Sequence, residues 1–267
     1  MKDKRIAVFC GGLKLPFLVV DSLRENGWSV LAVGLRGFYD SALKTDMVVR
    51  LGGGGAAIRE MKRRGITQMC FVGAIGHPNL SDIRPDLFSL GILAKIAKNA
   101  KGYDSMSTAL IAELQRRGFR VVAAQDICPD LTLDAGIHTR TRPSKSDQAN
   151  CARAIAVSHM IGREDIGQSV AVDGAVLAVE AAEGTAKMLE RVAAVHCGKK
   201  KSGVFAKMTK PGQNLKIDIP AIGVDTVNAV ADAGLHGIVI NAKTCFVIDR
   251  AAVIATANRR GIFISAV

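Results

Sequence analysis

Short runs of apolar and β-branched residues alternate with helical patterns along the first half of the chain. Strands are expected over residues 5–9, 29–33, 47–51, 67–72 and 119–124, and helices over 15–25, 56–64 and 105–117. Strands that alternate with helices are typical of a parallel sheet covered by helices on both faces. The sequence therefore predicts an α/β fold whose first domain, residues 1–128, is Rossmann-like.

The periodicity lapses between residues 129 and 145. This stretch contains Pro129-Asp130, the run from Asp134 to Gly136, and a basic polar segment that ends at Lys145. Clusters of proline, glycine and polar residues indicate a loop. We therefore expect a linker over 129–145 between two domains.

The second half begins with a helix expected over 147–161 and is then richer in strands. Asp173-Gly174 lies between two apolar runs and is the strongest short hairpin signal, because both central residues of such a turn need positive φ. Further strands are expected over 204–208, 237–240, 245–248 and 262–266, with helices over 185–195, 224–233 and 251–259. These elements predict a C-terminal mixed α/β domain over 146–267.

The chain carries a net charge of +12, which implies an anionic partner. Nucleic acid, an acidic bilayer surface and a phosphorylated substrate would each fit this charge. Aromatic residues make up only 4% of the chain, so stacking platforms for single-stranded nucleic acid are lacking. The sequence also contains no nucleic-acid recognition motif. We therefore expect no nucleic-acid partner.

The sequence points to a cytoplasmic protein. No apolar run reaches the roughly 18 residues of a membrane-spanning helix, and the run before Gly11 is too short for the core of a signal peptide. The six cysteines are dispersed, and no pair has the close spacing of a zinc site. We expect reduced, mostly buried thiols, and membrane contact that is only peripheral.

Two glycine clusters each follow an expected strand and precede a helix. Gly11 and Gly12 could bring backbone N–H groups close to a phosphate, although the full spacing of a dinucleotide fingerprint is missing. The run from Gly52 to Gly55 leaves the backbone free to approach a ligand. Structural turns or flexible connections are the alternatives. Four of these glycines, Gly11, Gly12, Gly52 and Gly55, are candidate substrate-binding residues.

Carboxylates flank the expected hairpin. Asp165 and Gln168 precede its first strand, and Glu180 and Glu183 follow its second strand, just before Thr185 at the start of a helix. A carboxylate at a strand end is more often solvated than catalytic, yet sites on mixed sheets are assembled at strand ends. The spacing alone does not decide between these alternatives.

The segment from Lys207, at the end of the strand expected over 204–208, to the helix that begins at 224 contains Lys207, Lys210, Lys216 and Asp218. A pair of cations can neutralise the charge of a pyrophosphate, and an aspartate nearby can hold Mg²⁺ or orient a water. A basic surface loop is the alternative. Prolines at 211 and 220 stiffen the segment, which favours a positioned group of side chains.

These motifs resemble those of the metal-dependent UDP-2,3-diacylglucosamine diphosphatases of lipid A synthesis, the class unrelated to calcineurin-like phosphoesterases. The matching elements of the second half are Asp165-Ile-Gly-Gln168, Val179-Glu-Ala-Ala-Glu-Gly-Thr185, Lys207 with Lys210-Pro211, Ile217-Asp-Ile-Pro-x-Ile-Gly223, Gly234-Leu-x-Gly237-Ile and Ile248-Asp-Arg250. Those of the first half are Gly11-Gly12-x-x-x-Pro16, Gly52-x-x-Gly55, Gly102-x-Asp104 and Gly118-Phe119. The resemblance covers essentially the whole chain, and its C-terminal half is the more specific.

The resemblance implies hydrolysis of UDP-2,3-diacylglucosamine to UMP and 2,3-diacylglucosamine 1-phosphate (lipid X), with water attacking the sugar-side phosphorus. It also implies Mg²⁺ or Mn²⁺, a UDP-linked glycolipid substrate, and a location at the anionic cytoplasmic surface of the inner membrane of a Gram-negative cell. The family's two domains close over the ligand, which would make the linker a hinge and the C-terminal domain catalytic. Whether the chain forms a homo-oligomer stays open.

The resemblance assigns roles to individual residues. Asp218 is implied as the catalytic aspartate, with Lys207 and Lys210 beside it. The candidate metal ligands are Asp218, Glu180, Glu183 and Asp165. The candidate substrate-binding residues, besides the four glycines, are Asp104, Gln168, Thr185 and Gln213.

Four positions depart from the family pattern: Ala56, Gln125, Ala186 and Asn241 stand where Lys, His, Asp and Glu are usual. Because Asp218, Glu180 and the lysines remain, activity is still expected. A dinucleotide-dependent oxidoreductase would also fit the Rossmann-like half, but its glycine fingerprint is incomplete. A non-catalytic nucleotide or lipid carrier is the second alternative, and it would retain a UDP-lipid without releasing UMP.

Overall fold

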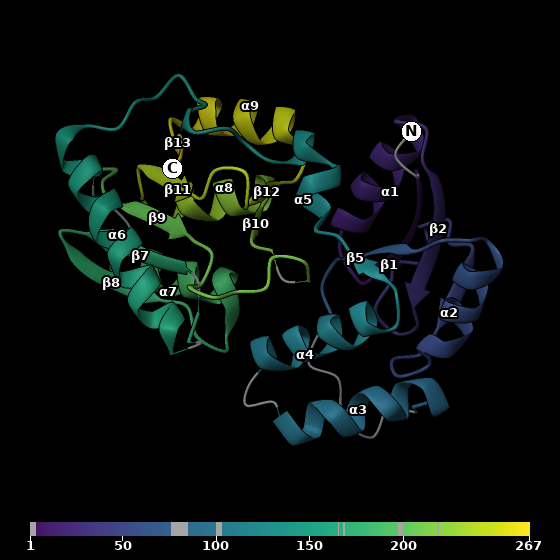
Figure 1. The fold of residues 1–267 in the computed structure, drawn as a ribbon. Coiled ribbons are helices and arrows are strands. Elements are labelled where there is room, and N and C mark those ends of the chain that lie inside the picture. The colour runs from purple at the N-terminus through teal and green to yellow at the C-terminus, as the bar shows by residue number, and fades with distance from the viewer. Residues whose placement is uncertain are drawn as a thin grey trace. The chain divides into compact units, whose positions relative to one another are not determined.

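The computed structural model describes residues 4–75, 85–99, 103–164, 166–167, 169–196, 200–217 and 219–267, with only the backbone described at 93, 95–99, 103–107 and 169. The chain forms two units, residues 1–128 with 214–218 and residues 129–213 with 219–267. Figure 1 labels the elements of both units. Each unit has its own main sheet, so each is described by itself.

The first unit is built on a parallel sheet. Its strands are β1 (Arg5–Cys10), β2 (Ser29–Leu35), β3 (Met47–Val49), β4 (Gln68–Val72) and β5 (Arg120–Val121), in the order β3-β2-β1-β4-β5. β1 lies in the middle and is buried from Ile6 onward, as expected of a central parallel strand made of apolar residues. The predicted Rossmann-like parallel sheet is confirmed.

Helices cover both faces of this sheet. They are α1 (Leu15–Glu25), α2 (Gly54–Arg63), α3 (Leu87–Asn99), α4 (Tyr103–Arg116) and the short α5 (Ala124–Ile127). Ala7 and Phe9 of β1 pack with apolar residues of α2, α3 and α4, whereas α1 packs on the sheet through residues outside that cluster and so covers the opposite face. Helix α3 is not among the predicted elements, because its mostly apolar sequence shows no clear helical period.

The second unit contains a mixed sheet. Its strands are β6 (Gly136–Ile137), β7 (Ser169–Asp173), β8 (Ala175–Val179), β9 (Val204–Lys207), β11 (Gly237–Ile240) and β13 (Phe263–Ala266), in the order β6-β13-β11-β9-β7-β8. Strands β9, β11 and β13 are parallel, while β6 and β7 run antiparallel to their neighbours. β10 (Ala221–Ile222) and β12 (Phe246–Val247) form a separate parallel pair. The predicted mixed α/β second domain is confirmed.

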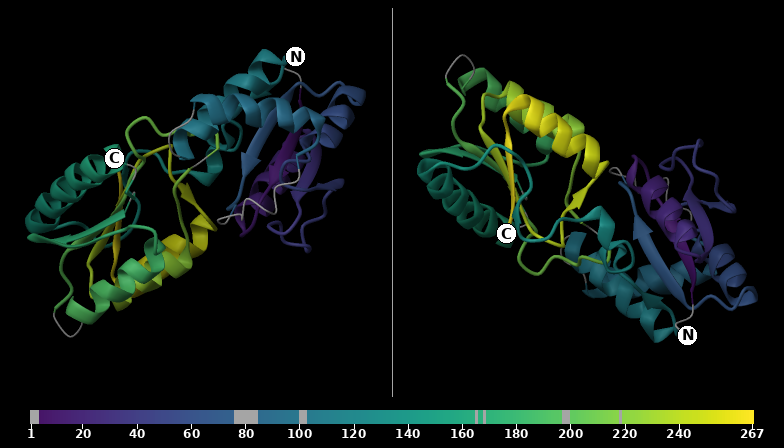
Figure 2. Two further views of the ribbon diagram at one scale, coloured as in Figure 1. Left: turned by 90° about the horizontal axis from the view of Figure 1, so that it is seen from below. Right: turned by 90° about the horizontal axis from the view of Figure 1, so that it is seen from above.

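The mixed sheet lies between two layers of helices. α6 (Lys145–Arg163) packs on one face, where Ala154 contacts buried residues of β7 and β9. α7 (Gly184–His196), α8 (Val224–Asp232) and α9 (Arg250–Arg260) cover the other face. Seen edge-on in Figure 2, the sheet has α6 on one side and α8 and α9 on the other.

Several strands of this sheet end at the same edge. β8 is antiparallel to β7, and β7 is antiparallel to β9, so β8 runs in the same direction as β9. The carboxyl ends of β8, β9, β11 and β13 therefore meet at the same edge, which we call the carboxyl edge. The opposite edge, where β9 and β11 begin, is the amino edge. Because connecting loops emerge at strand ends, these two edges are where polar side chains can converge.

The predicted hairpin is present as β7 and β8, but its turn differs from the expected type. Gly174 has a φ of +66°, whereas Asp173 does not have positive φ. The register also shifts between Ala171 and Val172. A bulge therefore adjusts the strand pairing, and a positive φ is needed only at the glycine.

The stretch 129–145, expected as a linker, packs within the second unit. It contains a 3-10 turn, Pro129–Leu131, and strand β6, which pairs with β13. Thr139 is buried, and its Oγ1 accepts a hydrogen bond from the N–H of Ile264 at 3.0 Å. These pairings join segments more than 100 residues apart, so the local polar composition gave no sign of them.

A short segment of the second half belongs to the first unit. Residues 214–217 pack there: Asn214 Nδ2 donates to Thr108 Oγ1 at 3.4 Å, and Gln125 Nε2 donates to the carbonyl of Leu215 at 3.3 Å. Ile217 packs against the apolar core of the first unit. The chain therefore passes between the units not only after residue 128 but also on either side of 214–218.

None of the helices in the described residues combines the length and the apolar character needed to cross a membrane.

Candidate functional site

Three side chains form a hydrogen-bonded chain at the carboxyl edge. Lys207 ends β9, Thr185 lies in the first turn of α7, and Glu180 directly follows β8. Lys207 Nζ donates to Thr185 Oγ1 at 2.8 Å, and Thr185 Oγ1 donates to Glu180 Oε1 at 2.8 Å. All three residues are half-buried. One hydroxyl thus joins a predicted catalytic cation to a predicted metal ligand.

The second carboxylate oxygen of Glu180 is buried and has no hydrogen-bond partner among the described residues. An unpaired buried carboxylate oxygen costs free energy unless a donor or a cation satisfies it. Oxygen ligands of this kind suit Mg²⁺ and Mn²⁺. Glu180 therefore has the chemistry and the environment of a metal ligand.

The other candidate ligands are placed differently. Asp165 and Asp218 lie outside the described residues. Glu183 forms an ion pair with Arg191 of α7. The hydrogen bond that the Glu183 carboxylate accepts from its own backbone N–H, together with Arg191, lowers the pKa of the carboxyl group. In the part of the chain that is described, no three His, Cys, Asp or Glu side chains gather as a complete metal site. The metal-binding set stays a prediction.

The loop after β9 has a defined backbone. Lys210 N donates to Gln213 Oε1 at 2.8 Å, and Gln213 N donates back to Lys210 O at 3.1 Å. Gln213, predicted to bind substrate, is only 8% exposed and closes this turn. A Cβ on Gly162 of α6 would lie 3.0 Å from Pro211 Cδ, so the glycine lets the helix pack closely on the loop. Lys210 is therefore carried on a constrained backbone.

A cysteine lies near this site. Cys245 is fully buried, and burial raises the pKa of its thiol to about 12, an effect that the charge of Lys207 partly offsets. Because the thiolate is the nucleophilic form, this neutral thiol does not act as a nucleophile at physiological pH. Cys245 packs in the apolar core of the second unit.

The structure gives Gly11 and Gly12 a role in the backbone of the first unit. Their N–H groups donate to the carbonyls of Val72 and Ala74, each at 2.8 Å. A Cβ on Gly11 would lie 2.6 Å from the Ala74 oxygen. The N–H groups suggested as phosphate donors therefore bind carbonyls at and just after the end of β4, and the need for glycine follows from this close approach of two backbones. Substrate contact by these residues stays a prediction.

The second glycine cluster surrounds a carboxylate that the sequence analysis missed. Gly55 N donates to Asp86 Oδ2 at 2.7 Å, Ser89 N donates to Asp86 Oδ1 at 2.8 Å, and Asp86 N donates to the Gly52 carbonyl at 2.9 Å. Burial alone would raise the pKa of Asp86, but the hydrogen bonds from Ser89 and Gly55 outweigh it and lower that pKa. Asp86 therefore occupies the anion position at the N-terminal ends of α2 and α3. Its place just before an apolar helix is an N-cap signal that could have identified it.

The other predicted site residues, and the positions that depart from the family pattern, are spread over the chain. Gln168 lies outside the described residues, and for Asp104 only its backbone position in α4 is described. Gln125 has a buried Oε1 without a partner among the described residues. Ala56 lies in α2 and Ala186 is exposed on α7, whereas Asn241 lies at the carboxyl edge.

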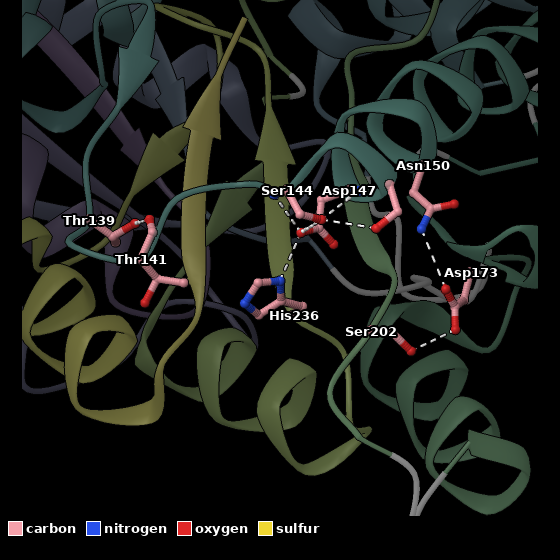
Figure 3. A network of polar contacts seen from close by, with 9 residues as sticks. Thr139, Thr141, Ser144, Asp147, Asn150, Asp173, Ser202 and His236 are labelled. Carbon is pink, nitrogen blue, oxygen red and sulfur yellow. Dashed lines mark hydrogen bonds and ion pairs between the residues drawn. The ribbon is translucent and has the colours of Figure 1, made fainter.

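A separate polar network lies at the amino edge (Figure 3). Ser202 Oγ donates to Asp173 Oδ2 at 2.7 Å, and His196 Nε2 lies 3.2 Å from the same oxygen. His196 Nδ1 faces the carbonyl of Ala233 at 3.0 Å. In a hydrolytic triad the imidazole lies between the hydroxyl and the carboxylate, but here the hydroxyl donates to the carboxylate itself, and one ring nitrogen, His196 Nε2, faces both groups, with Ser202 Oγ at 3.4 Å. These residues therefore join chain segments and do not activate Ser202 as a nucleophile.

The same network continues to the start of α6. Asp147 forms a capping box with Ser144 and lies 2.9 Å from His236 Nδ1 through its Oδ2. Figure 3 shows Asp147 between Ser144 and His236, with Asn150 further along α6 reaching toward Asp173. The network ties α6 to the start of β11 and to the β7–β8 turn, and the sequence analysis found none of these long-range pairs.

Two family models match the chain. The LpxI N-terminal domain matches residues 5–131, and the LpxI C-terminal domain matches residues 134–265. The chain is also similar to the UDP-2,3-diacylglucosamine pyrophosphatase LpxI of Caulobacter vibrioides. The two are 34% identical over 270 residues, which cover 98% of this chain and 96% of that protein.

Proposed function

Because this chain belongs to the LpxI family, we propose that it hydrolyses the pyrophosphate of UDP-2,3-diacylglucosamine to UMP and 2,3-diacylglucosamine 1-phosphate. The structural observation that carries the proposal is the chain from Lys207 through Thr185 to Glu180. It brings an ammonium group close to a carboxylate that has an unpaired buried oxygen. A diphosphate needs a cation of this kind to offset its charge, and a hydrolase needs an oxygen ligand to hold a divalent metal.

The two lysines are proposed to act on the leaving group. Water attacks the sugar-side phosphorus, the bond to the bridging oxygen breaks, and UMP departs. Negative charge then develops on the departing phosphate oxygen, where Lys207 and Lys210 stabilise it. The constrained loop that carries Lys210 supports this role, because charge stabilisation in a transition state depends on groups that are already in position.

The acidic residues are proposed to hold the metal and the water. Glu180, together with Asp165 and Asp218, would bind Mg²⁺ or Mn²⁺, which when bound neutralises phosphate charge. Asp218, which the family resemblance implies as the catalytic aspartate, is proposed to orient the attacking water. The unpaired oxygen of Glu180 is the support for this assignment within the described residues.

Because the proposed substrate is a lipid, the enzyme would act at a membrane surface. We propose peripheral binding at the cytoplasmic face of the inner membrane of a Gram-negative cell. The net charge of +12 supports this, because each Lys or Arg near an anionic bilayer contributes about 1 kcal/mol to binding.

The direct test is UMP release from UDP-2,3-diacylglucosamine in ¹⁸O-labelled water. We expect the label in the sugar phosphate, since water attacks the sugar-side phosphorus. Label in UMP would contradict that direction of attack while leaving the hydrolysis itself supported. Asp218→Ala serves as the control, because it should bind the lipid without turning it over.

The same experiment distinguishes the alternatives. A carrier would retain the UDP-lipid, and no UMP would appear with any metal. An oxidoreductase would require a bound dinucleotide, and the pairing of the Gly11 and Gly12 N–H groups with backbone carbonyls gives that reading no support.

A further inference from the structure

Asn241 makes a double contact at the carboxyl edge. It follows β11, and its Oδ1 accepts hydrogen bonds from Thr209 N at 2.7 Å and from Thr209 Oγ1 at 3.0 Å. Thr209 lies in the loop between the two lysines of the candidate site. Both Asn241 and Thr209 are half-buried. One side-chain oxygen just after the end of β11 thus fixes both the backbone and the side chain of Thr209, the residue before Lys210.

Loss of the Asn241–Thr209 contact would be destabilising, because Asn241 Oδ1 satisfies the backbone N–H of Thr209. Met208, just before Thr209, is fully buried, so the loop leaves the sheet from a fixed point. The turn from Lys210 to Gln213 is closed by its own hydrogen bonds. Asn241 is therefore the described side chain that anchors the first part of this loop to the next strand. Without it, the half-buried Thr209 N–H would lose its partner and the loop would shift to regain one.

We propose that Asn241 is a positioning residue of the diphosphate site, which fixes Thr209 and thereby the placement of Lys210 relative to Lys207. The inference rests on the proposed function, since it assumes that these lysines act on the diphosphate. A carboxamide suits the position because its oxygen accepts both hydrogen bonds without adding negative charge where the phosphates bind. A carboxylate, such as the Glu that the family pattern usually has at this position, would accept the same bonds but add a negative charge.

Two variants of Asn241 and one control separate the loss of the hydrogen-bond acceptor from the addition of a negative charge. Asn241→Ala removes the acceptor, and we expect kcat to fall by about 10²-fold, since small misplacements of catalytic groups have effects of this size. Asn241→Asp keeps the acceptor and adds a charge, so kcat should recover to within about 10-fold of the wild type while KM rises. Asn258→Ala is the matched control, because Asn258 Oδ1 likewise accepts a backbone N–H, that of Arg140 at 2.7 Å, but near the end of α9, just before β13 begins at the amino edge.

Hydrogen exchange of the Thr209 amide gives a readout that does not need activity. The amide should be protected in the wild type and in Asn241→Asp, and should exchange faster in Asn241→Ala. The inference is overturned if Asn241→Ala keeps kcat within about twofold of the wild type, if Asn258→Ala loses as much kcat, or if Asn241→Asp fails to recover kcat. If the wild type itself releases no UMP, the proposed function fails, and unchanged Thr209 exchange in Asn241→Ala would separately refute the positioning role.

Discussion

The ammonium group of Lys207 donates a hydrogen bond to the hydroxyl of Thr185 at 2.8 Å, although the two residues lie on different elements and 22 positions apart. The same hydroxyl donates to Glu180, so it accepts from a cation and donates to an anion at once. A hydroxyl is suited to this place because it offers one donor and two acceptor positions. Thr185 therefore sets the distance between the two charged groups.

Removing this hydroxyl should impair catalysis more than folding. Thr185→Val keeps the shape of the side chain but loses both hydrogen bonds, and we expect kcat/KM to fall by about 10- to 100-fold, the size seen when supporting groups around a site are lost. Thr185→Ser keeps the hydroxyl and should stay close to the wild type. Steady-state kinetics, with a thermal melt of each variant, checks this. Equal activity of the Val and Ser variants would show that the hydroxyl has no positioning role.

The metal prediction can be tested through Glu180. Chelation should stop UMP release, and Mg²⁺ should restore it where Zn²⁺ does not, because hard oxygen ligands without His or Cys suit Mg²⁺. In Glu180→Gln, the Mg²⁺ concentration for half-maximal activity should rise by about 10-fold or more, since even indirect supporting groups contribute that much to metal affinity. Full activity of demetallated protein in EDTA would contradict the metal requirement altogether.

The amino-edge network predicts a loss of stability in acid. Burial alone would raise the pKa values of Asp147 and Asp173, but hydrogen bonds lower both: those from Ser144 and His236 to Asp147, and those from Ser202 and His196 to Asp173. A carboxyl group with a lowered folded pKa contributes stability above its unfolded pKa, about 3.9 for Asp, and loses it as the pH falls through the folded pKa. The free energy of unfolding should therefore decrease as the pH falls below about 4.

Urea unfolding between pH 6 and pH 2.5 measures this dependence. The double variant Asp147→Asn with Asp173→Asn should be less stable at pH 6 and should show a flatter pH profile. Asp134→Asn is the control, because the Asp134 side chain is 84% exposed and, among the described residues, its carboxylate has only a 3.7 Å surface ion pair with Lys243. A profile of the double variant parallel to that of the wild type would remove these two carboxylates from the explanation.

Replacing either of two neighbouring glycines of α2 with alanine should change the stability of the protein, in opposite directions for the two positions. A Cβ on Gly55 would lie 2.6 Å from Asp86 Oδ2, so Gly55→Ala must displace this carboxylate and should cost about 1–3 kcal/mol of stability. A Cβ on Gly54 would lie 3.7 Å from Ser89 Oγ, an ordinary contact. Gly54→Ala should therefore stabilise by about 0.4–1 kcal/mol by restricting the unfolded chain. Denaturant midpoints of both variants check the signs, and equal effects would show that Asp86 does not lie against α2.

Much of the fold follows from the sequence alone. The central strands of the first unit are continuous apolar runs, such as Ile6 to Cys10, and such runs occur in parallel sheets that are buried on both faces. The dipeptide Asp173-Gly174 marks the hairpin, because Gly174 can adopt positive φ without strain. Lys207, Lys210 and Glu180 can be identified from the sequence, because charged residues at or after the end of an expected strand can be recognised without knowing which strands pair.

Only the tertiary structure decides which of these groups meet. Glu180, Thr185 and Lys207 come together because β7 folds back between β8 and β9, and Asn241 reaches Thr209 because β11 lies beside β9. Asp86 similarly comes to Gly55 from 31 positions away. The spacing of apolar residues indicates which face of a helix or strand is buried. It does not indicate which other element packs against that face. That partner is selected by packing and hydrogen bonding between distant segments, after the chain has paid the loop-closure entropy that brings them together.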